Sequence, residues 1–375
     1  MAKKLTVVFL VAFCVCFLIW GAGYVKRSGL LERYAEREYL TADESAQRPA
    51  YQSLSNDEKA LYTALYRGIC DHSREIMLPF DADGEMFEKV YYLVEKQESE
   101  LFYIDSSFYT AEKIKKAKII YRTEDEDEIS EKTRILNDKL DEIVSQIPDD
   151  SDDFEKLTFI HDYIISNCKY TAGDNDATAY GCLVEGKAVC EGYAKAFDLL
   201  AKRVGIASLV LTGMTDDGEN HAWNQFELGG TWYNADITWD DNDKDGELSH
   251  VYFLCNDTSF YQNEDTPKNM HVHIADDEYI KPMKCKSADN YYVKAGLFAE
   301  DMNTAEKILC REIKRGADSV ELKFSDSKTY SDFKDEFISG EKIFRLIMDN
   351  STVSGLMTIT TTENKDERVI RIGFR

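Results

Sequence analysis

Three residues whose side chains can form a nucleophilic triad occur within a short stretch of this sequence: Cys190, His221 and Asp236. Cys190 follows a glycine-bearing segment, at the point where the apolar pattern of residues 188–204 predicts a buried helix. A thiol at a helix N-terminus lies at the positive end of the helix dipole, which favours the nucleophilic thiolate. Taken alone, the pattern also fits an inert buried cysteine, because free cysteine is often buried.

Two alternating runs, 221–228 and 231–238, flank a pair of glycines and predict a β-hairpin. With the glycines as the two loop residues, His221 lies diagonal to Asp236 on the same face of the hairpin. Diagonal neighbours are about 7–8 Å apart at the backbone, which a carboxylate and an imidazole can bridge. The opposite face carries apolar side chains that suit packing against a helix.

The three residues together meet the requirements of a Cys-His-Asp triad. The imidazole of His221 would take the thiol proton, and the carboxylate of Asp236 would fix the imidazole tautomer and stabilise the imidazolium. A single histidine on a strand is more often structural than catalytic. The conjunction of a helix-start cysteine with a strand histidine and a neighbouring aspartate favours catalysis.

The segments that carry these residues resemble the signature blocks of the transglutaminase-like superfamily. They read Gly-Lys-Ala-Val-Cys-Glu-Gly-Tyr-Ala at 186–194, His-Ala-Trp at 221–223 and Trp-Tyr-Asn-Ala-Asp-Ile-Thr-Trp at 232–239. The resemblance implies an α+β fold with a papain-like transglutaminase core, in which a helix carries the cysteine and an antiparallel sheet carries the histidine and aspartate. It also implies no obligatory cofactor and thiol acyl transfer, either peptide or isopeptide hydrolysis or glutamine–amine crosslinking.

Three further residues are predicted to contribute to the site. The oxyanion hole would use the backbone N–H of Cys190 and one upstream donor, for which Tyr180 is our candidate. Gly192 would let a substrate backbone approach the sulfur, and Trp223 would contribute to substrate binding. The partner would be a peptide or protein, with an amine as co-substrate if the reaction is transamidation.

No metal site is predicted. Residues 241–252 resemble the first half of an EF-hand loop, but the twelfth position is Tyr252 rather than Glu, which favours a solvated acidic loop. His271 and His273 with Cys285 match no standard zinc spacing.

The amino-acid composition argues against some classes of binding partner. The chain has 375 residues, with 70 acidic and 45 basic side chains and a net charge of −25. This acidity argues against binding bare nucleic acid, which needs clustered Lys and Arg. A non-catalytic envelope module that binds a peptide or partner on the same fold remains the alternative to an enzyme.

Residues 5–25 form an uncharged run that is long enough to span a bilayer. The run fits either a signal anchor or a cleaved secretory signal. Counting the flanking basic residues places the body in the cytosol, whereas the short tail before the run favours export. We predict a single-pass membrane protein with an extracytoplasmic body, or a secreted protein if the signal is cleaved.

The chain is expected to contain four parts: the membrane-associated segment 1–27, a stalk and mostly helical or α+β region at 28–150, the catalytic domain at 151–285, and a small α+β domain at 286–375. Hydrophobic periodicity predicts the elements within them. The predicted helices are 55–66, 126–147, 154–168, 188–204 and 304–314, with helical turns at 333–347; the predicted strands are 101–104, 118–121, 209–212, 221–228, 231–238, 320–324, 356–361 and 368–374.

Overall fold

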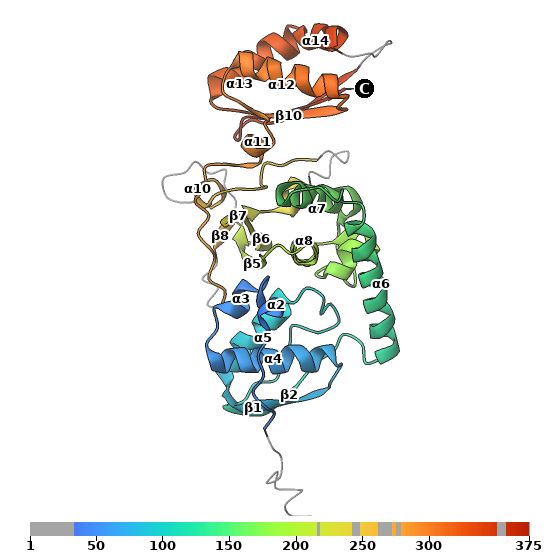
Figure 1. Cartoon of the computed structure of the whole chain (residues 1–375), viewed down its shortest axis with the longest axis vertical. Helices are drawn as coiled ribbons and strands as arrows, with labels where there is room; N and C mark the ends of the chain where they lie inside the picture. Colours follow the sequence, from blue (N-terminus) through green and yellow to red (C-terminus); the bar gives the residue numbers. More distant parts are fainter. Residues whose placement is uncertain are drawn as a thin grey trace, which may run out of the picture.

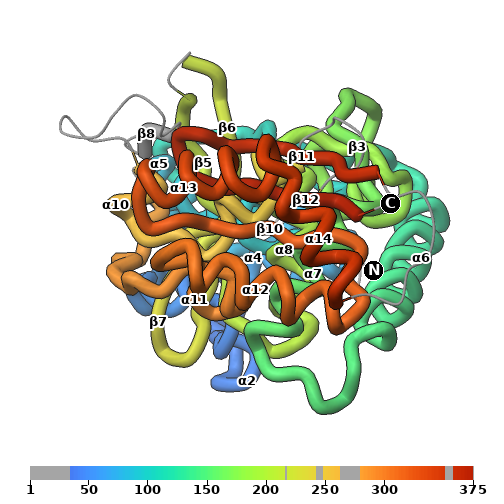
Figure 2. Tube along the Cα trace, turned by 90° about the horizontal axis from the view of Figure 1, so that it is seen from above, coloured from blue at the N-terminus to red at the C-terminus, as the bar shows by residue number. Residues whose placement is uncertain are grey.

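The computed structural model describes residues 34–215, 218–241, 248–261, 272–274, 279–350 and 358–374. Three units follow one another along the longest axis in chain order, with the N-terminal region at one end and the C-terminal unit at the other (Figure 1). Seen along that axis, the C-terminal unit lies over the middle unit (Figure 2).

The N-terminal region combines helices with a two-stranded antiparallel sheet, β1–β2. Its elements are α2 (Ala42–Ser45), α3 (Pro49–Gln52), α4 (Asn56–Cys70), β1 (Glu75–Asp83), α5 (Gly84–Gln97), β2 (Lys113–Lys118) and α6 (Glu126–Val144). The helix predicted at 55–66 is confirmed, and Ser55 caps it in a reciprocal arrangement with Glu58. The predicted strands 101–104 and 118–121 are wrong, apart from Lys118 at the end of β2. Residues 102 and 103 form a turn, and a single bridge joins Ile104 to Tyr121.

The middle unit places a buried helix, α8, against a four-stranded antiparallel sheet of order β7-β6-β5-β8. The elements of this unit are α7 (Asp153–Asn167), β3 (Lys169–Tyr170), the π-helical segment η1 (Gly181–Glu185), β4 (Lys187–Ala188), α8 (Cys190–Arg203), β5 (Ser208–Thr215), β6 (Asn220–Leu228), β7 (Thr231–Ala235), α9 (Ile237–Asp240), α10 (Asp257–Phe260) and β8 (Val272–Ile274).

The hairpin β6–β7 has the predicted register, since Leu228 pairs with Thr231 and Asn224 with Ala235. The predicted second strand is too long, however. Strand β7 ends at Ala235, and Asp236 caps the short helix α9 by accepting a hydrogen bond from the backbone N–H of Trp239. Asp236 therefore lies at the junction of a strand and a helix rather than within a strand.

The C-terminal unit is an α+β unit, as predicted, with a sheet of order β11-β12-β10-β9. Its elements are α11 (Tyr291–Lys294), β9 (Phe298–Ala299), α12 (Met302–Arg315), β10 (Ser319–Phe324), α13 (Ser327–Phe333), the π-helical segment η2 (Lys334–Ser339), α14 (Lys342–Asn350), β11 (Ile359–Asn364) and β12 (Val369–Phe374).

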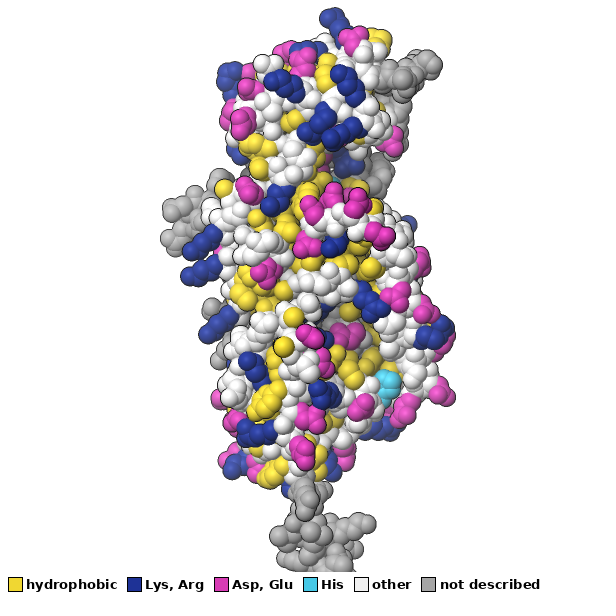
Figure 3. All heavy atoms as spheres, in the orientation of Figure 1, with side chains coloured by type: hydrophobic (Ala, Val, Ile, Leu, Met, Phe, Trp, Pro, Cys, Tyr) yellow, Lys and Arg dark blue, Asp and Glu magenta, His cyan; other side chains and the backbone are white. Residues whose placement is uncertain are grey.

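Two large hydrophobic cores and one small cluster organise the part of the chain that the structure describes. The first core contains buried side chains from Leu40 of the N-terminal region to Tyr292, together with Val369, and the second lies within the C-terminal unit. The first core is continuous across residue 150, and the predicted domain boundaries stay predictions. On the face drawn in Figure 3, acidic side chains are interspersed with basic ones.

The apolar run predicted to associate with a membrane, residues 5–25, lies outside the described residues. Within the part of the chain that the structure describes, none of the helices has the length and apolar character needed to cross a bilayer.

Candidate active site

Cys190 is the first residue of α8, as predicted. The preceding residue, Val189, provides no side-chain cap, so the first backbone N–H groups of the helix are not satisfied by a capping oxygen. The thiol is half-buried and packs beside Ala194, Val210 and Ala222, which come from the helix and the two central strands. Helix α8 thus presents the sulfur at its positive end, next to the sheet.

His221 and Asp236 are joined by a short hydrogen bond, with His221 Nε2 2.6 Å from Asp236 Oδ2. Asp236 is fully buried and His221 is almost so. The second carboxylate oxygen of Asp236 accepts the backbone N–H of Trp239 at 3.1 Å, which fixes the orientation of the carboxylate. Because Nε2 is engaged, Nδ1 is the ring nitrogen that remains for the thiol.

The electrostatic environment favours the charged form of His221. Burial alone would lower the pKa of the imidazole, but the charge and hydrogen bond of Asp236 outweigh burial. A smaller contribution from the thiol of Cys190 acts in the same direction, and together these interactions raise the pKa of His221 to about 10. The site can therefore hold an imidazolium beside the sulfur at neutral pH.

Two indole rings hold the imidazole of His221. Trp239 stacks on it with ring centroids 4.8 Å apart, and Trp223 lies parallel to it at 6.3 Å. Trp223 is 1% exposed and donates its indole N–H to Tyr261, so its position supports the histidine and leaves no surface for a substrate. The half-buried Trp239 belongs to the third signature block but is not among the predicted site residues.

Gly192 is also buried, against the prediction that it opens the site to a substrate. A Cβ at this position would lie 2.2 Å from the backbone oxygen of Asp176. The same oxygen accepts the N–H of Val189, at the N-cap of α8. The glycine therefore allows a loop to approach the start of the catalytic helix, and its role is in packing.

The structure places Tyr180 in a different environment from Cys190. Its ring stacks on Phe102 with centroids 4.9 Å apart and lies beneath the ammonium group of Lys132. The tyrosine found near Cys190 is Tyr170, whose phenol interacts electrostatically with the thiol and backbone of Cys190. Burial and the nearby sulfur raise the pKa of Tyr170. No local sequence signal links Tyr170 to the cysteine, because the two residues meet through the pairing of β3 with β4.

The structure describes only part of the other candidate ligand groups. Asp241 accepts a hydrogen bond from Tyr193 at 2.5 Å, whereas residues 242–247 of the acidic loop are not described. His271 is outside the described residues, and the backbone of His273 pairs with Met214. The sulfur of Cys285 accepts a hydrogen bond from Gln225.

Comparison with known proteins identifies the domain that carries this site. Residues 141–237 match the transglutaminase-like superfamily. The chain contains a transglutaminase-like domain. The matched segment includes Cys190, His221 and Asp236, so the resemblance seen in the sequence is confirmed.

Among solved structures, this chain is similar to a candidate cysteine protease from Cytophaga hutchinsonii, with 20% identity and a TM-score of 0.24. The match covers 28% of this chain and 37% of that one. A TGase matches with 14% identity and a TM-score of 0.26 over 31% and 34% of the two chains. Menin matches with 12% identity and a TM-score of 0.24 over 78% and 61%. This chain spans less than two-thirds of the length of each. A search of curated proteins finds no match.

Proposed function

We propose that this protein is a thiol acyl-transfer enzyme that acts on amide groups of peptides or proteins, with Cys190 as nucleophile, His221 as general base and acid, and Asp236 as the group that orients His221. The observation that carries the proposal is the 2.6 Å hydrogen bond between His221 Nε2 and Asp236 Oδ2, beside a cysteine at a helix start. The position of all three residues within the transglutaminase-like segment supports it.

The proposed reaction has two steps. The Cys190 thiolate attacks the carbonyl carbon of the substrate amide, a C–S bond forms, and the developing oxyanion accepts a hydrogen bond from the backbone N–H of Cys190. His221 then gives its proton to the leaving amine as the C–N bond breaks, which leaves a thioester on Cys190. In the second step, His221 takes a proton from water or from an amine, and this nucleophile displaces the thiol.

Tyr170 has a defined place in this scheme. Its phenol lies near the backbone N–H of Cys190 that would stabilise the oxyanion. Tyr170 is 45% exposed, so it also borders solvent at this point. We propose that Tyr170 lines the entrance for the acyl group.

The acceptor in the second step decides between hydrolysis and transamidation. Water gives a peptidase or amidase, and a primary amine gives a crosslinking enzyme. Incubating the protein with a glutamine-containing peptide and a fluorescent primary amine separates the two reactions: incorporation of the amine indicates transamidation, and release of ammonia without incorporation indicates hydrolysis.

The central test is iodoacetamide labelling across pH, mapped by mass spectrometry, on the full chain and its His221→Ala variant. Below pH 7, where an ordinary thiol with a pKa of about 8.5 is mostly protonated, we expect Cys190 to label at least about tenfold faster than the other cysteines. The His221→Ala variant should lose this preference. Equal labelling of Cys190 and the buried thiols in the parent protein would contradict an activated nucleophile.

We also propose that residues 5–25 attach the protein to a membrane, with the enzyme on the extracytoplasmic side. The uncharged length of this run supports the proposal. A reporter enzyme that is active only outside the cytosol, fused to the C-terminus, tests the orientation. If only a reporter that is active in the cytosol gave a signal, the C-terminal part of the protein would lie on the cytosolic side, opposite to the proposed orientation.

A further inference from the structure

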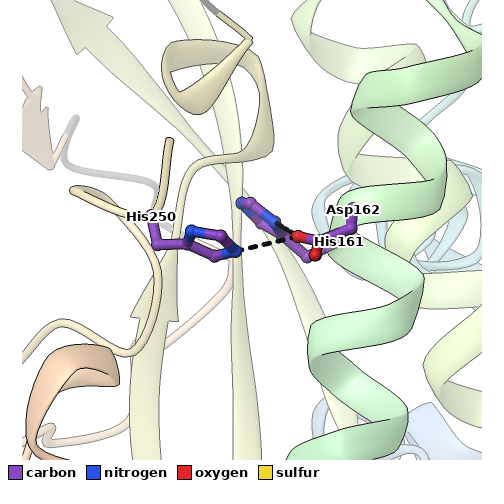
Figure 4. A group of neighbouring side chains, drawn as sticks. All are labelled: His161, Asp162 and His250. Atoms are coloured by element: carbon purple, nitrogen blue, oxygen red, sulfur yellow. Dashed lines mark hydrogen bonds and ion pairs between the residues drawn. The ribbon is translucent and has the colours of Figure 1, made fainter. Parts of the chain in front are cut away.

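A second cluster of ionisable side chains lies apart from the candidate active site. His161 and Asp162, both on α7, meet His250 from the loop that follows β7 and α9 (Figure 4). One potential ligand atom from each residue lies within 4.8 Å of the other two. Asp162 Oδ1 is 2.8 Å from Nδ1 of His161 and 2.9 Å from Nε2 of His250, so a single oxygen faces both rings.

The far side of each imidazole is held by another carboxylate. His161 Nε2 lies 3.2 Å from Oδ2 of Asp240, and His250 Nδ1 lies 2.9 Å from Oε2 of Glu321. Metal-binding histidines nearly always donate their second ring N–H to a carboxylate, a carbonyl or water, which fixes the tautomer and directs the other nitrogen to the metal. Both histidines of this cluster have that arrangement.

The outer carboxylates are themselves fixed by hydrogen bonds. Asp240 accepts the backbone N–H of Tyr252 at 3.0 Å, and Glu321 accepts the hydroxyl of Tyr292 at 2.9 Å. His161 is fully buried and stacks beside Phe253, and His250 stacks on a tyrosine ring. A rigid, nearly dry setting of this kind keeps ligands oriented before an ion arrives.

The stacked arrangement of the two rings favours a cation at the centre. The rings of His161 and His250 lie with centroids 4.8 Å apart inside the protein, and each ring faces a carboxylate on either side. Three carboxylates, those of Asp162, Asp240 and Glu321, therefore surround the two rings. One divalent cation between the rings would offset part of this negative charge while both rings serve as neutral ligands.

We propose that His161, Asp162 and His250 bind a divalent transition-metal ion of the zinc class, with Asp240 and Glu321 as the carboxylates that orient the two histidines. Two imidazole nitrogens and one carboxylate oxygen form a donor set that suits Zn²⁺. Ligand atoms on a tetrahedral zinc are about 3.3 Å apart. Binding would therefore move Asp162 Oδ1 away from each ring by about 0.5 Å and bring the two imidazole nitrogens, now within 4.8 Å of each other, closer by up to about 1.5 Å. Asp162 is 33% exposed, which leaves a solvent path and a fourth position for water.

The site would connect parts of the molecule that are distant in sequence. Helix α7 and helix α9 belong to the middle unit, whereas Glu321 belongs to β10 of the C-terminal unit. The metal would thus hold the C-terminal unit against the middle unit. Through Asp240 it would also fix the position of α9, the helix that Asp236 caps. This assignment is independent of the proposed acyl-transfer activity.

The test measures metal binding rather than turnover. The full chain, carried in a Cys190→Ser background to remove the active-site thiol, is stripped with a chelator and titrated with Zn²⁺ alone. We expect about one zinc per chain and a higher melting temperature with metal. Co²⁺ in the same site should give the visible absorption of a four-coordinate ion without a thiolate charge-transfer band.

Matched variants locate the ion. His161→Gln and His250→Gln should abolish binding, and the one-third exposed Asp162 provides Asp162→Asn as a variant that is less disruptive to folding. Glu321→Gln should weaken zinc affinity about 10- to 100-fold. Its control is Glu363→Gln, which removes another carboxylate of the C-terminal unit that accepts a tyrosine hydroxyl, and this variant should bind normally.

Two results would overturn the proposal. One is a stripped, folded protein that takes up no Zn²⁺ at micromolar concentrations. The other is binding that survives in His250→Gln and Asp162→Asn but is lost in His221→Gln or in a His271→Gln/His273→Gln double variant, because that would place the ion at another site.

Discussion

The ring of Trp239 stacks on that of His221, with centroids 4.8 Å apart and planes 16° apart. The same residue donates its backbone N–H to Asp236, the hydrogen-bond partner of His221. Trp239 therefore contacts one member of the proposed triad with its side chain and orients another with its backbone. Its side chain and its backbone can be tested separately, because a substitution removes only the ring.

Replacing Trp239 with Ala should slow alkylation of Cys190 at pH 6, because the imidazole loses the ring that fixes its plane. Misplacing a catalytic group by about 1 Å can reduce a rate by up to about 100-fold, and we expect a loss within that limit. Trp239→Phe should restore most of the rate. Trp232→Ala, which removes a half-buried indole from β7, is the control and should label at the parental rate.

Asp236→Asn tests the orienting carboxylate. An Asn oxygen can still accept the N–H of Trp239, so α9 should stay capped, while the negative charge beside His221 is lost. Turnover of any accepted substrate should fall by roughly 10²- to 10⁴-fold, because the imidazolium is no longer stabilised. Alkylation of Cys190 at low pH should fall less than in His221→Ala. An Asn variant with parental turnover would remove Asp236 from the mechanism.

The contact between His221 and Asp236 could be predicted because the signals for the hairpin are local. A pair of glycines between two alternating runs sets the register, and the register sets which side chains are neighbours. The end of β7 was missed for a local reason as well. Aspartate is a favourable N-cap residue, so Asp236 could have indicated the start of a helix. The alternation of apolar and polar residues continues through residue 238, however, and this pattern predicts a strand there.

Other parts of the site could not be predicted from the sequence because they depend on contacts between distant segments. Tyr170 reaches Cys190 through a short parallel pairing, and His250 reaches Asp162 across 88 residues of chain. For Gly192, the local sequence suggested a role in substrate access, but the structure shows a packing contact with a distant segment. A glycine beside a nucleophile suggested access for a substrate, whereas the structure uses the missing Cβ to admit the backbone of Asp176.

Gly192→Ala should therefore destabilise the protein rather than alter substrate preference. The new methyl group would meet a backbone oxygen at 2.2 Å, and overpacking of a buried site costs about 1–3 kcal/mol. Urea unfolding measures the loss. Gly173→Ala is the matched control, since a Cβ at that position meets nothing within 4 Å. A stable Gly192→Ala variant with altered substrate selectivity would return the residue to the substrate site.

A buried ion-pair network beside the nucleophile ties α8 to the N-terminal region. Lys195 Nζ lies 2.8 Å from Glu95 Oε1 and 2.9 Å from Glu191 Oε1, and Lys195 is almost fully buried. Lys195→Met should lower the free energy of unfolding by up to about 3–5 kcal/mol, because both carboxylates must then share Lys96, which lies 2.7 Å from Glu191 Oε1 and 3.1 Å from Glu95 Oε2. Lys195→Met/Glu95→Gln should regain part of the loss. Lys156→Met, which breaks a more exposed pair with Asp153, should cost no more than about 1 kcal/mol.

The pairing of His221 with Asp236 also predicts how stability depends on pH. The folded pKa of His221, about 10, lies above the unfolded value of about 6.5, so the folded state binds the proton more tightly. The stabilisation is fully present below about pH 6.5 and is lost progressively as the pH rises towards 10. The difference in unfolding free energy between the parent protein and Asp236→Asn should therefore be a few kcal/mol near pH 6 and should shrink as the pH approaches 10.

Measuring that difference by urea unfolding at several pH values isolates this pair, because other titrating groups contribute equally to both proteins. Asp257→Asn serves as the control. Asp257 accepts hydrogen bonds from Asn234 and from the backbone of Cys285, without a histidine partner. Its substitution should cost stability by an amount that does not change between about pH 6 and 8, below the range in which the neighbouring Cys285 thiol titrates in the unfolded chain. If the Asp236→Asn difference were equally flat, His221 would not be held as an imidazolium in the folded protein, and low-pH activation of Cys190 would need another source.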